Sequence, residues 1–145
     1  MADYPLHLVR RRKLADGREV VVRPMRAEDA AAEREFLTRV DYDRHMAFVC
    51  EAADGAIVGN SRYVVNPDGR SCEFGVVVSD DWRRSGVAQL LMEALFRAAR
   101  ARKLDTMEGL VSSENRDMLA FARALGFEAG AQPADPALVR VVKKL

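Results

Sequence analysis

The chain has 145 residues, a formal net charge of +1, and 49% hydrophobic against 31% charged residues. This length is typical of one domain with a buried core, so we expect a single domain over residues 1–145. The near-neutral charge argues against nucleic-acid or anionic-membrane binding. The sequence contains no run of about 18 apolar residues, the length that would predict a membrane span. Because the N-terminal residues lack the apolar stretch of a signal peptide, the sequence favours a cytoplasmic protein.

The N-terminal half predicts strands and one helix. Residues 6–24, "LHLVRRRKLADGREVVVRP", indicate two strands joined at Asp16-Gly17, a pair typical of tight hairpin turns. An Ala- and Glu-rich stretch predicts a helix over residues 28–39. Three further strands are expected, separated by turn sequences, and they would form an antiparallel meander. These strands cover residues 46–52, 56–65 and 71–79.

The C-terminal half contains the clearest helix. From Val87 onward, apolar residues recur at i, i+3, i+4, i+7, i+8 and i+11, which is one face of an amphipathic helix. A strand over 106–112 and a helix over 115–125 follow, and Gly126 suits the left-handed position that ends a helix. The last strand, 138–145, is expected to pair with "FEAGA". The predicted class is α+β, or mixed α/β.

Both cysteines lie in apolar, strand-like runs. Cys50 and Cys72 have neither metal-ligand spacing nor neighbours that suggest a disulfide framework. We therefore expect two free thiols in a reducing compartment and no metal site.

The loop before the long helix, "DDWRRSGVA", has features of a phosphate site. The first N–H groups of a helix lack internal partners and carry the positive end of its dipole, and Arg83, Gly86 and Ala88 combine charge with small residues. Alternatively, the arginines are solvated and Ser85 is only an N-cap. No nucleotide P-loop or G-x-G-x-x-G motif occurs in the chain.

The chain contains, in order, a strand, "RRSGVA", an amphipathic helix, a strand and "SSENRDMLAFARALGF". This order resembles the GCN5-related N-acetyltransferase (GNAT) family. In that family an R/Q-x-x-G-x-G/A loop binds the pyrophosphate of acetyl-CoA. The resemblance runs from about Val20 to the C-terminus, and it implies a mostly antiparallel central sheet flanked by helices, with acetyl-CoA as co-substrate. The residues it implies for coenzyme binding are Val76, Val77, Val78, Arg83, Arg84, Ser85, Gly86, Val87, Ala88 and Asn115.

Residues 40–49 and 72–95 are most similar to the acetyltransferase domain of bacterial protein lysine acetyltransferases. The first-helix region is shorter here than in those relatives, so the acceptor is not carried over with the resemblance. In this chain "DYDRH", residues 41–45, is either an acceptor rim or the solvated entry to a strand.

The resemblance also implies catalytic roles. A protonated amine must lose a proton before attacking a thioester, and Glu73 matches the family's strand glutamate that acts as base. Alternatively, Glu73 is a strand residue that points at solvent. Val77, on the same strand face, would offer its N–H to the thioester oxygen while its side chain packs in the core. His45 is a weaker candidate base.

Two positions on the second helix complete the expected site. Asn115 is either a pantetheine contact or a plain N-cap. Ala122 stands where many relatives have a tyrosine acid, so the thiolate would leave unassisted, through water, or with Ser112. The sequence thus predicts acetyl transfer to a primary amine, with a protein lysine favoured. The alternatives are a small-amine acetyltransferase and a non-catalytic acyl-CoA sensor. The short segment before "DYDRH" would leave the acceptor side open, which suits a protein acceptor, but a homodimer could equally well cover it.

Overall fold

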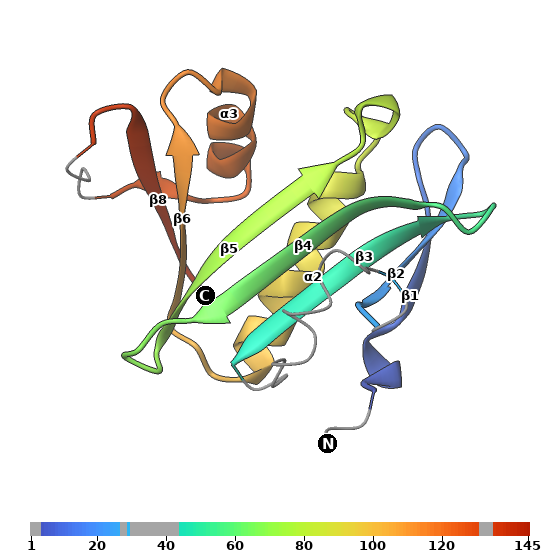
Figure 1. The fold of residues 1–145 in the computed structure, drawn as a ribbon, viewed down its shortest axis with the longest axis horizontal. Coiled ribbons are helices and arrows are strands. Elements are labelled where there is room, and N and C mark those ends of the chain that lie inside the picture. Colours follow the sequence, from blue (N-terminus) through green and yellow to red (C-terminus); the bar gives the residue numbers. More distant parts are fainter. Residues whose placement is uncertain (1–3, 27–28, 30–43, 131–134) are drawn as a thin grey trace.

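The computed structural model describes residues 4–26, 29, 44–130 and 135–145. In this part of the chain one sheet has the strand order β1-β2-β3-β4-β5-β6-β8-β7. Helix α2 (Val87–Ala101) packs across one face of the sheet, and α3 (Arg116–Ala124) lies beside β6 (Figure 1). The strands are β1 Arg10–Lys13, β2 Glu19–Pro24, β3 His45–Ala52, β4 Ile57–Val65, β5 Ser71–Val78, β6 Thr106–Ser112, β7 Glu128–Ala129 and β8 Leu138–Lys144.

The predicted hairpin and meander are confirmed. Strands β1 to β5 are joined antiparallel in chain order, and Gly17 has the positive φ, 92°, that its turn requires. Strand β8 pairs antiparallel with the short β7, as the sequence predicts, and also with β6, which the sequence did not predict. The predicted helix over 28–39 and the shortened first-helix region lie outside the described residues, apart from Asp29.

Helix α2 is held close to β4. A Cβ on Gly59 would lie 3.0 Å from Cδ1 of Leu91 and 3.1 Å from the Val77 carbonyl, so a larger residue here would force its neighbours to shift. The Ser61 hydroxyl donates to the Leu91 carbonyl at 3.1 Å, and Leu91 is fully buried. These contacts place the N-terminus of α2 next to the end of β5.

Strands β5 and β6 separate part-way along their length. They are parallel neighbours over only three register pairs, from Ser71↔Thr106 to Glu73↔Glu108. Beyond Glu73, β5 continues beside β4 alone, whereas β6 continues beside β8. The two strands diverge from that point (Figure 1), and the gap between their backbones is here called the notch. The edge of β5 that faces the notch therefore has backbone groups without a strand partner.

No helix among the described residues has the length and apolar character needed to cross a membrane.

Candidate active site

The loop between β5 and α2 directs several backbone N–H groups outward. Arg84 and Gly86 both have positive φ, 59° and 97°. Over residues 44–130, no hydrogen-bond acceptor is found for the N–H groups of Arg84, Ser85, Gly86 or Ala88. Unpaired N–H groups at the positive end of a 15-residue helix form an anion site of the kind that binds phosphates.

Ser85 also makes the local contacts expected of a capping residue. Its hydroxyl donates to the Trp82 carbonyl and accepts from the Val87 N–H at 3.3 Å, although Gly86 occupies the N-cap position itself. These contacts support the turn of the loop and leave the neighbouring N–H groups available. The capping and anion-binding interpretations are therefore compatible.

The loop is anchored to the first hairpin by its aromatic residue. The Arg18 guanidinium lies 3.8 Å from the centre of the Trp82 ring, a cation–π contact. Arg83 instead projects into solvent and forms an exposed ion pair with Asp80 at 3.1 Å. An exposed pair of this kind is weak, so Arg83 can exchange Asp80 for a bound phosphate at little cost.

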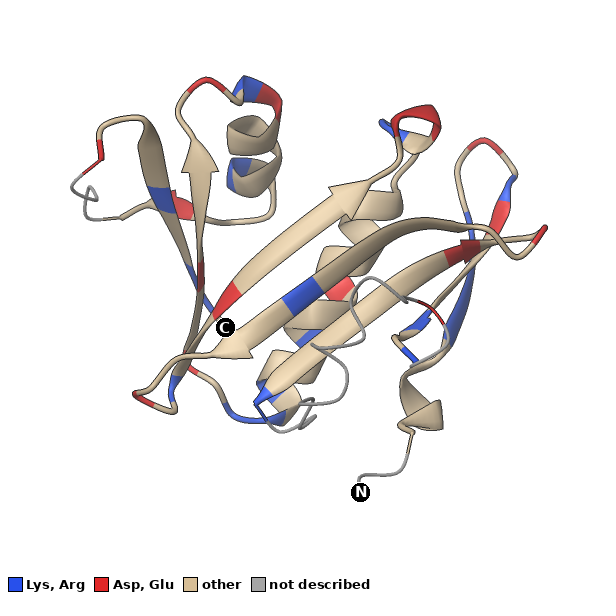
Figure 2. Ribbon diagram, viewed as in Figure 1, with Lys and Arg blue, Asp and Glu red and all other residues tan. Residues whose placement is uncertain are grey.

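Strand β5 presents Glu73 and Val77 on the face opposite α2. Its other residues are uncharged, so Glu73 is the one charge along this strand (Figure 2). Val77 is 63% exposed, and the prediction that its side chain packs in the core is wrong. The core-facing side chains are instead those of Phe74, Val76 and Val78. Strand alternation explains this, because residues two apart share a face.

The same alternation decides which N–H groups face the notch. The Ser79 N–H donates to Val58 at one end of the β4–β5 ladder, and the Asn66 N–H donates to Ser71 at the other. The register between them is continuous, so the intervening hydrogen-bonded pairs include Val77 with Asn60. The Val77 N–H therefore points into the sheet, contrary to prediction, and the amides of Val76 and Val78 face the notch.

Glu73 lies at the apex of the notch and is exposed to solvent rather than shielded by Phe74. No hydrogen bond or ion pair is recorded for its carboxylate within the described residues. His45 is on the same sheet face, but Val64 lies between them in the register, so the two side chains are two strands apart. That separation is about 10 Å, too far for His45 to replace Glu73 directly. Asp41 and Asp43 lie outside the described residues.

Helix α3 begins beside the notch at Asn115. The Asn115 side chain accepts a hydrogen bond from the Met118 N–H at 3.1 Å, which makes it the N-cap. Ala122 is 1% exposed and carries only a methyl group, so this position supplies no side-chain acid. The Ser112 hydroxyl accepts from the Glu114 N–H at 3.3 Å and remains exposed.

One feature of the apex was missed by the sequence analysis. Phe74 and Gly109 directly follow the last register pair of β5 and β6, and a Cβ on Gly109 would lie 2.6 Å from the Phe74 ring. The ring centre of Phe74 is 5.0 Å from that of Phe127. A lone glycine and a distant phenylalanine give a weak signal in a sequence, because only the strand register shows that the two residues are in contact.

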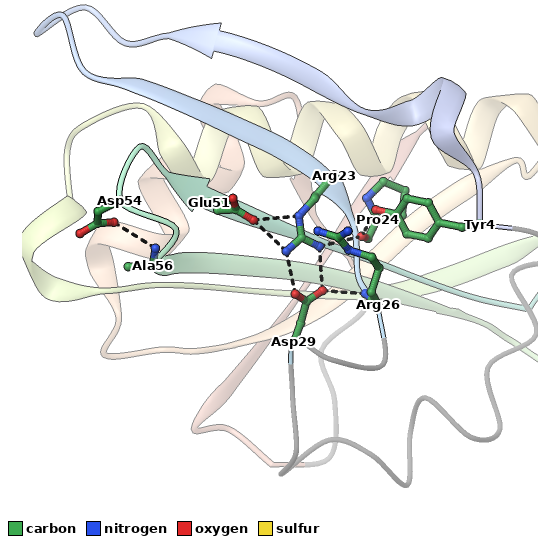
Figure 3. Close-up of polar contacts among 8 residues, drawn as sticks. All are labelled: Tyr4, Arg23, Pro24, Arg26, Asp29, Glu51, Asp54 and Ala56. Atoms are coloured by element: carbon green, nitrogen blue, oxygen red, sulfur yellow. Dashed lines mark hydrogen bonds and ion pairs between the residues drawn. The ribbon is translucent and has the colours of Figure 1, made fainter.

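Strand β2 contributes a separate polar cluster on the same face of the sheet. Arg23 donates to both carboxylate oxygens of Asp29, at 2.6 and 2.8 Å, and to Glu51 (Figure 3). The Arg23 and Asp29 side chains are only 7% and 8% exposed. This cluster lies three strands from Glu73 and is separate from the site at the notch. In the described part of the chain, no three His, Cys, Asp or Glu side chains are grouped to hold a metal.

Comparison with known proteins identifies the family of this chain. The family model described as "Acetyltransferase (GNAT) family" matches residues 14–127. The chain belongs to this family. It is also 32% identical to an acetyltransferase of Pseudomonas aeruginosa, over 84% of this chain and 82% of that protein.

Solved structures show the same GNAT fold. The GNAT domain of S. lividans PAT superimposes with a TM-score of 0.88 at 20% identity, covering 99% of this chain and all of that one. A cAMP-binding acyltransferase from Mycobacterium smegmatis matches with a TM-score of 0.76 and 20% identity, over 96% of this chain but 48% of that one. This GNAT chain is therefore an acetyltransferase, and enzymes of its family take the acyl group from an acyl-CoA.

Proposed function

We propose that this GNAT enzyme transfers the acetyl group of acetyl-CoA directly to a primary amine in a ternary complex, with a protein lysine as the favoured acceptor. The observation that carries the proposal is the position of the N–H-rich loop at the open end of the notch, with Glu73 at its apex. The pyrophosphate binds to the loop and to Arg83. The pantetheine arm then runs down the unpartnered edge of β5 toward Glu73.

The chemistry uses the exposed face of β5 and the edge of β5 that faces the notch. The amine approaches from the exposed face, and Glu73 takes its proton directly or through one water. The amine nitrogen then attacks the carbonyl carbon, while the amide of Val76 or Val78 stabilises the negative charge on the oxygen. The attacking nitrogen then loses its second proton to water, the carbon–sulfur bond breaks, and the electron pair leaves with the coenzyme thiolate, which can take up that proton. That thiolate has a conjugate-acid pKa of about 8.5, so it departs without the tyrosine that Ala122 replaces.

A protein acceptor is supported by the openness of the Glu73 face. Val77 is 63% exposed and Val64, opposite Glu73 on β4, is 37% exposed, so a lysine on a folded surface can approach. The resemblance of residues 72–95 to protein lysine acetyltransferases supports the same acceptor. Asn115, as a rigid N-cap beside the notch, is proposed to contact the pantetheine through its amide nitrogen.

The test is thiol release from acetyl-CoA with lysine peptides, folded lysine-rich proteins, acyl-CoA synthetases and small amines as acceptors. We expect release with protein lysines, and a loss of at least about 100-fold in turnover for Glu73→Gln, within the range that a general base contributes. Acetyl-CoA affinity, measured by calorimetry, should be unchanged in this variant. Glu19→Gln, an exposed glutamate on β2, is the matched control and should retain full activity.

Three outcomes would contradict parts of this proposal. Release with small amines alone would reassign the acceptor. Equal turnover by wild type and Glu73→Gln would remove Glu73 from the mechanism. Tight coenzyme binding without release from any acceptor would favour a sensor of acyl-CoA.

A further inference from the structure

The apex of the notch is closed on the α2 side by the Phe74 ring. Phe74 and Gly109 are the first residues beyond the last β5–β6 register pair, Glu73↔Glu108. The nearest three atoms to a Cβ built on Gly109 all belong to the Phe74 ring, at 2.6 to 3.0 Å. The ring therefore occupies the space where a side chain from β6 would otherwise lie.

The Phe74 ring is also supported from behind. It packs against Phe127 with ring centres 5.0 Å apart, and Phe127 packs against Phe96 at 6.0 Å. Phe127 and Phe96 are 3% and 5% exposed, so this row of aromatic rings extends into the core. The half-buried Phe74 ring thus has Gly109 on one side and Phe127 on another.

The geometry of a thioester relates this ring to the acyl chain. A trigonal carbonyl carbon has three substituents in one plane, and the amine attacks perpendicular to that plane. With the oxygen directed at the amide of Val76 or Val78, and the sulfur directed up the notch toward the loop, the third substituent points toward the apex. Glu73 and Phe74 are consecutive and face opposite sides of the sheet, so the amine arrives on one side and the ring bounds the other.

We infer that Phe74 is a specificity-determining residue that restricts the acyl group to acetyl by filling the space that longer chains need. The inference rests on the proposed function, since it uses the thioester position given there. Each extra methylene of a longer acyl-CoA must displace the Phe74 ring or strand β6, which contacts the ring at Gly109. One methylene more or less in a hydrophobic pocket changes kcat/KM by about 10-fold or more, so the effect is measurable.

The test compares acetyl-, propionyl-, butyryl- and hexanoyl-CoA with one fixed acceptor. For the wild type we expect kcat/KM to fall at least about 10-fold from acetyl- to butyryl-CoA. Phe74→Ala should remove most of this difference, and the milder Phe74→Leu should remove part of it if the alanine variant folds poorly. Phe96→Leu, which alters the same aromatic row away from the notch, should keep the wild-type profile.

Calorimetric dissociation constants for the same four thioesters provide a second readout that does not need turnover. If no acceptor supports transfer but the affinity profile still depends on Phe74, the proposed function fails and this inference stands. A butyryl-to-acetyl ratio that is the same in wild type and in both folded Phe74 variants would overturn the inference. So would a wild type that uses butyryl-CoA as well as acetyl-CoA.

Discussion

Arg84 and Gly86 both adopt left-handed backbone conformations, with φ values of 59° and 97°, and one residue separates them. Alternation between right- and left-handed conformations turns successive N–H groups toward a common point, which is the geometry of an anion-binding nest. The positive φ of Arg84 is uncommon for a residue with a side chain and costs about 1 kcal/mol. Under the proposed function, the backbone shape of this loop contributes to coenzyme binding in addition to the charge of its arginines.

The first prediction concerns Gly86. Replacing it with alanine places a Cβ on a residue with a φ of 97°, which should destabilise the fold by about 1 kcal/mol and distort the N–H cluster. We expect acetyl-CoA binding to weaken about 10-fold in calorimetry. Gly69→Ala is the matched control, because Gly69 also has a positive φ, 68°, with open space around it, and lies in the turn at the opposite end of β5.

Gly69→Ala should lower the free energy of unfolding by a similar amount while leaving the coenzyme dissociation constant unchanged. If both variants bind acetyl-CoA as tightly as the wild type does, the loop is not the phosphate site. Equal weakening in both would show a general effect of stability instead.

Local patterns in the sequence were sufficient to predict most of the fold. Asp16-Gly17 specified its hairpin, the apolar repeat from Val87 specified α2, and Gly126 has the expected positive φ of 96° after α3. Each of these depends on neighbours within one or two turns of the chain. The phosphate-site prediction for the loop before α2 is local in the same way, because its glycine and arginines lie within a few residues.

The details of the notch depend on contacts between distant strands and could not be predicted in that way. Alternation showed that Glu73 and Val77 share a face, but a run of three valines does not show which face is buried. The direction of the Val77 N–H depends on the β4–β5 register. The contact between Phe74 and Gly109 depends on a parallel pairing across 35 residues of chain, which no local pattern shows.

The second prediction concerns the pH dependence of stability. Asp29 is nearly buried; burial raises its pKa, but the hydrogen bonds from Arg23 and the Arg26 N–H outweigh this and hold the pKa below the ordinary value. A carboxyl with a lowered pKa in the folded state contributes stability that is fully present above its unfolded pKa of about 3.9. That contribution is lost as the pH falls through the folded-state value.

We therefore expect Asp29→Asn to be destabilised by about 3 kcal/mol at pH 7, since it leaves Arg23 with one carboxylate fewer in a buried cluster. The difference from the wild type should shrink as the pH falls below about 4, when the wild type protonates Asp29. Urea unfolding at pH 7, 5, 4 and 3 measures this. Asp16→Asn, which alters the exposed pair with Arg18, should have little effect, and a difference for Asp29→Asn that is constant with pH would contradict the explanation.

The third prediction concerns the two cysteines, which are free as the sequence predicted and are both fully buried. Burial raises the pKa of the Cys50 thiol to about 11, and burial together with the charge of Glu108 raises that of Cys72 to about 12. The thiolate is the reactive form, so neither residue should react with an aromatic disulfide reagent at pH 8 while the protein is folded. Denaturation should expose both thiols within minutes.

This low reactivity bears directly on the enzymatic test, which detects the thiol of released coenzyme A with the same reagent. Cys72 lies next to Glu73 in β5 and contacts the Thr106 carbonyl through its sulfur at 3.7 Å, so its exposure would report opening of the strand pair at the apex. We expect an absorbance background below one-tenth of a thiol per chain over the assay. Rapid reaction of one thiol in the folded protein, abolished in Cys72→Ser, would show that β5 and β6 separate further in solution. The Phe74 ring would then not keep the apex closed.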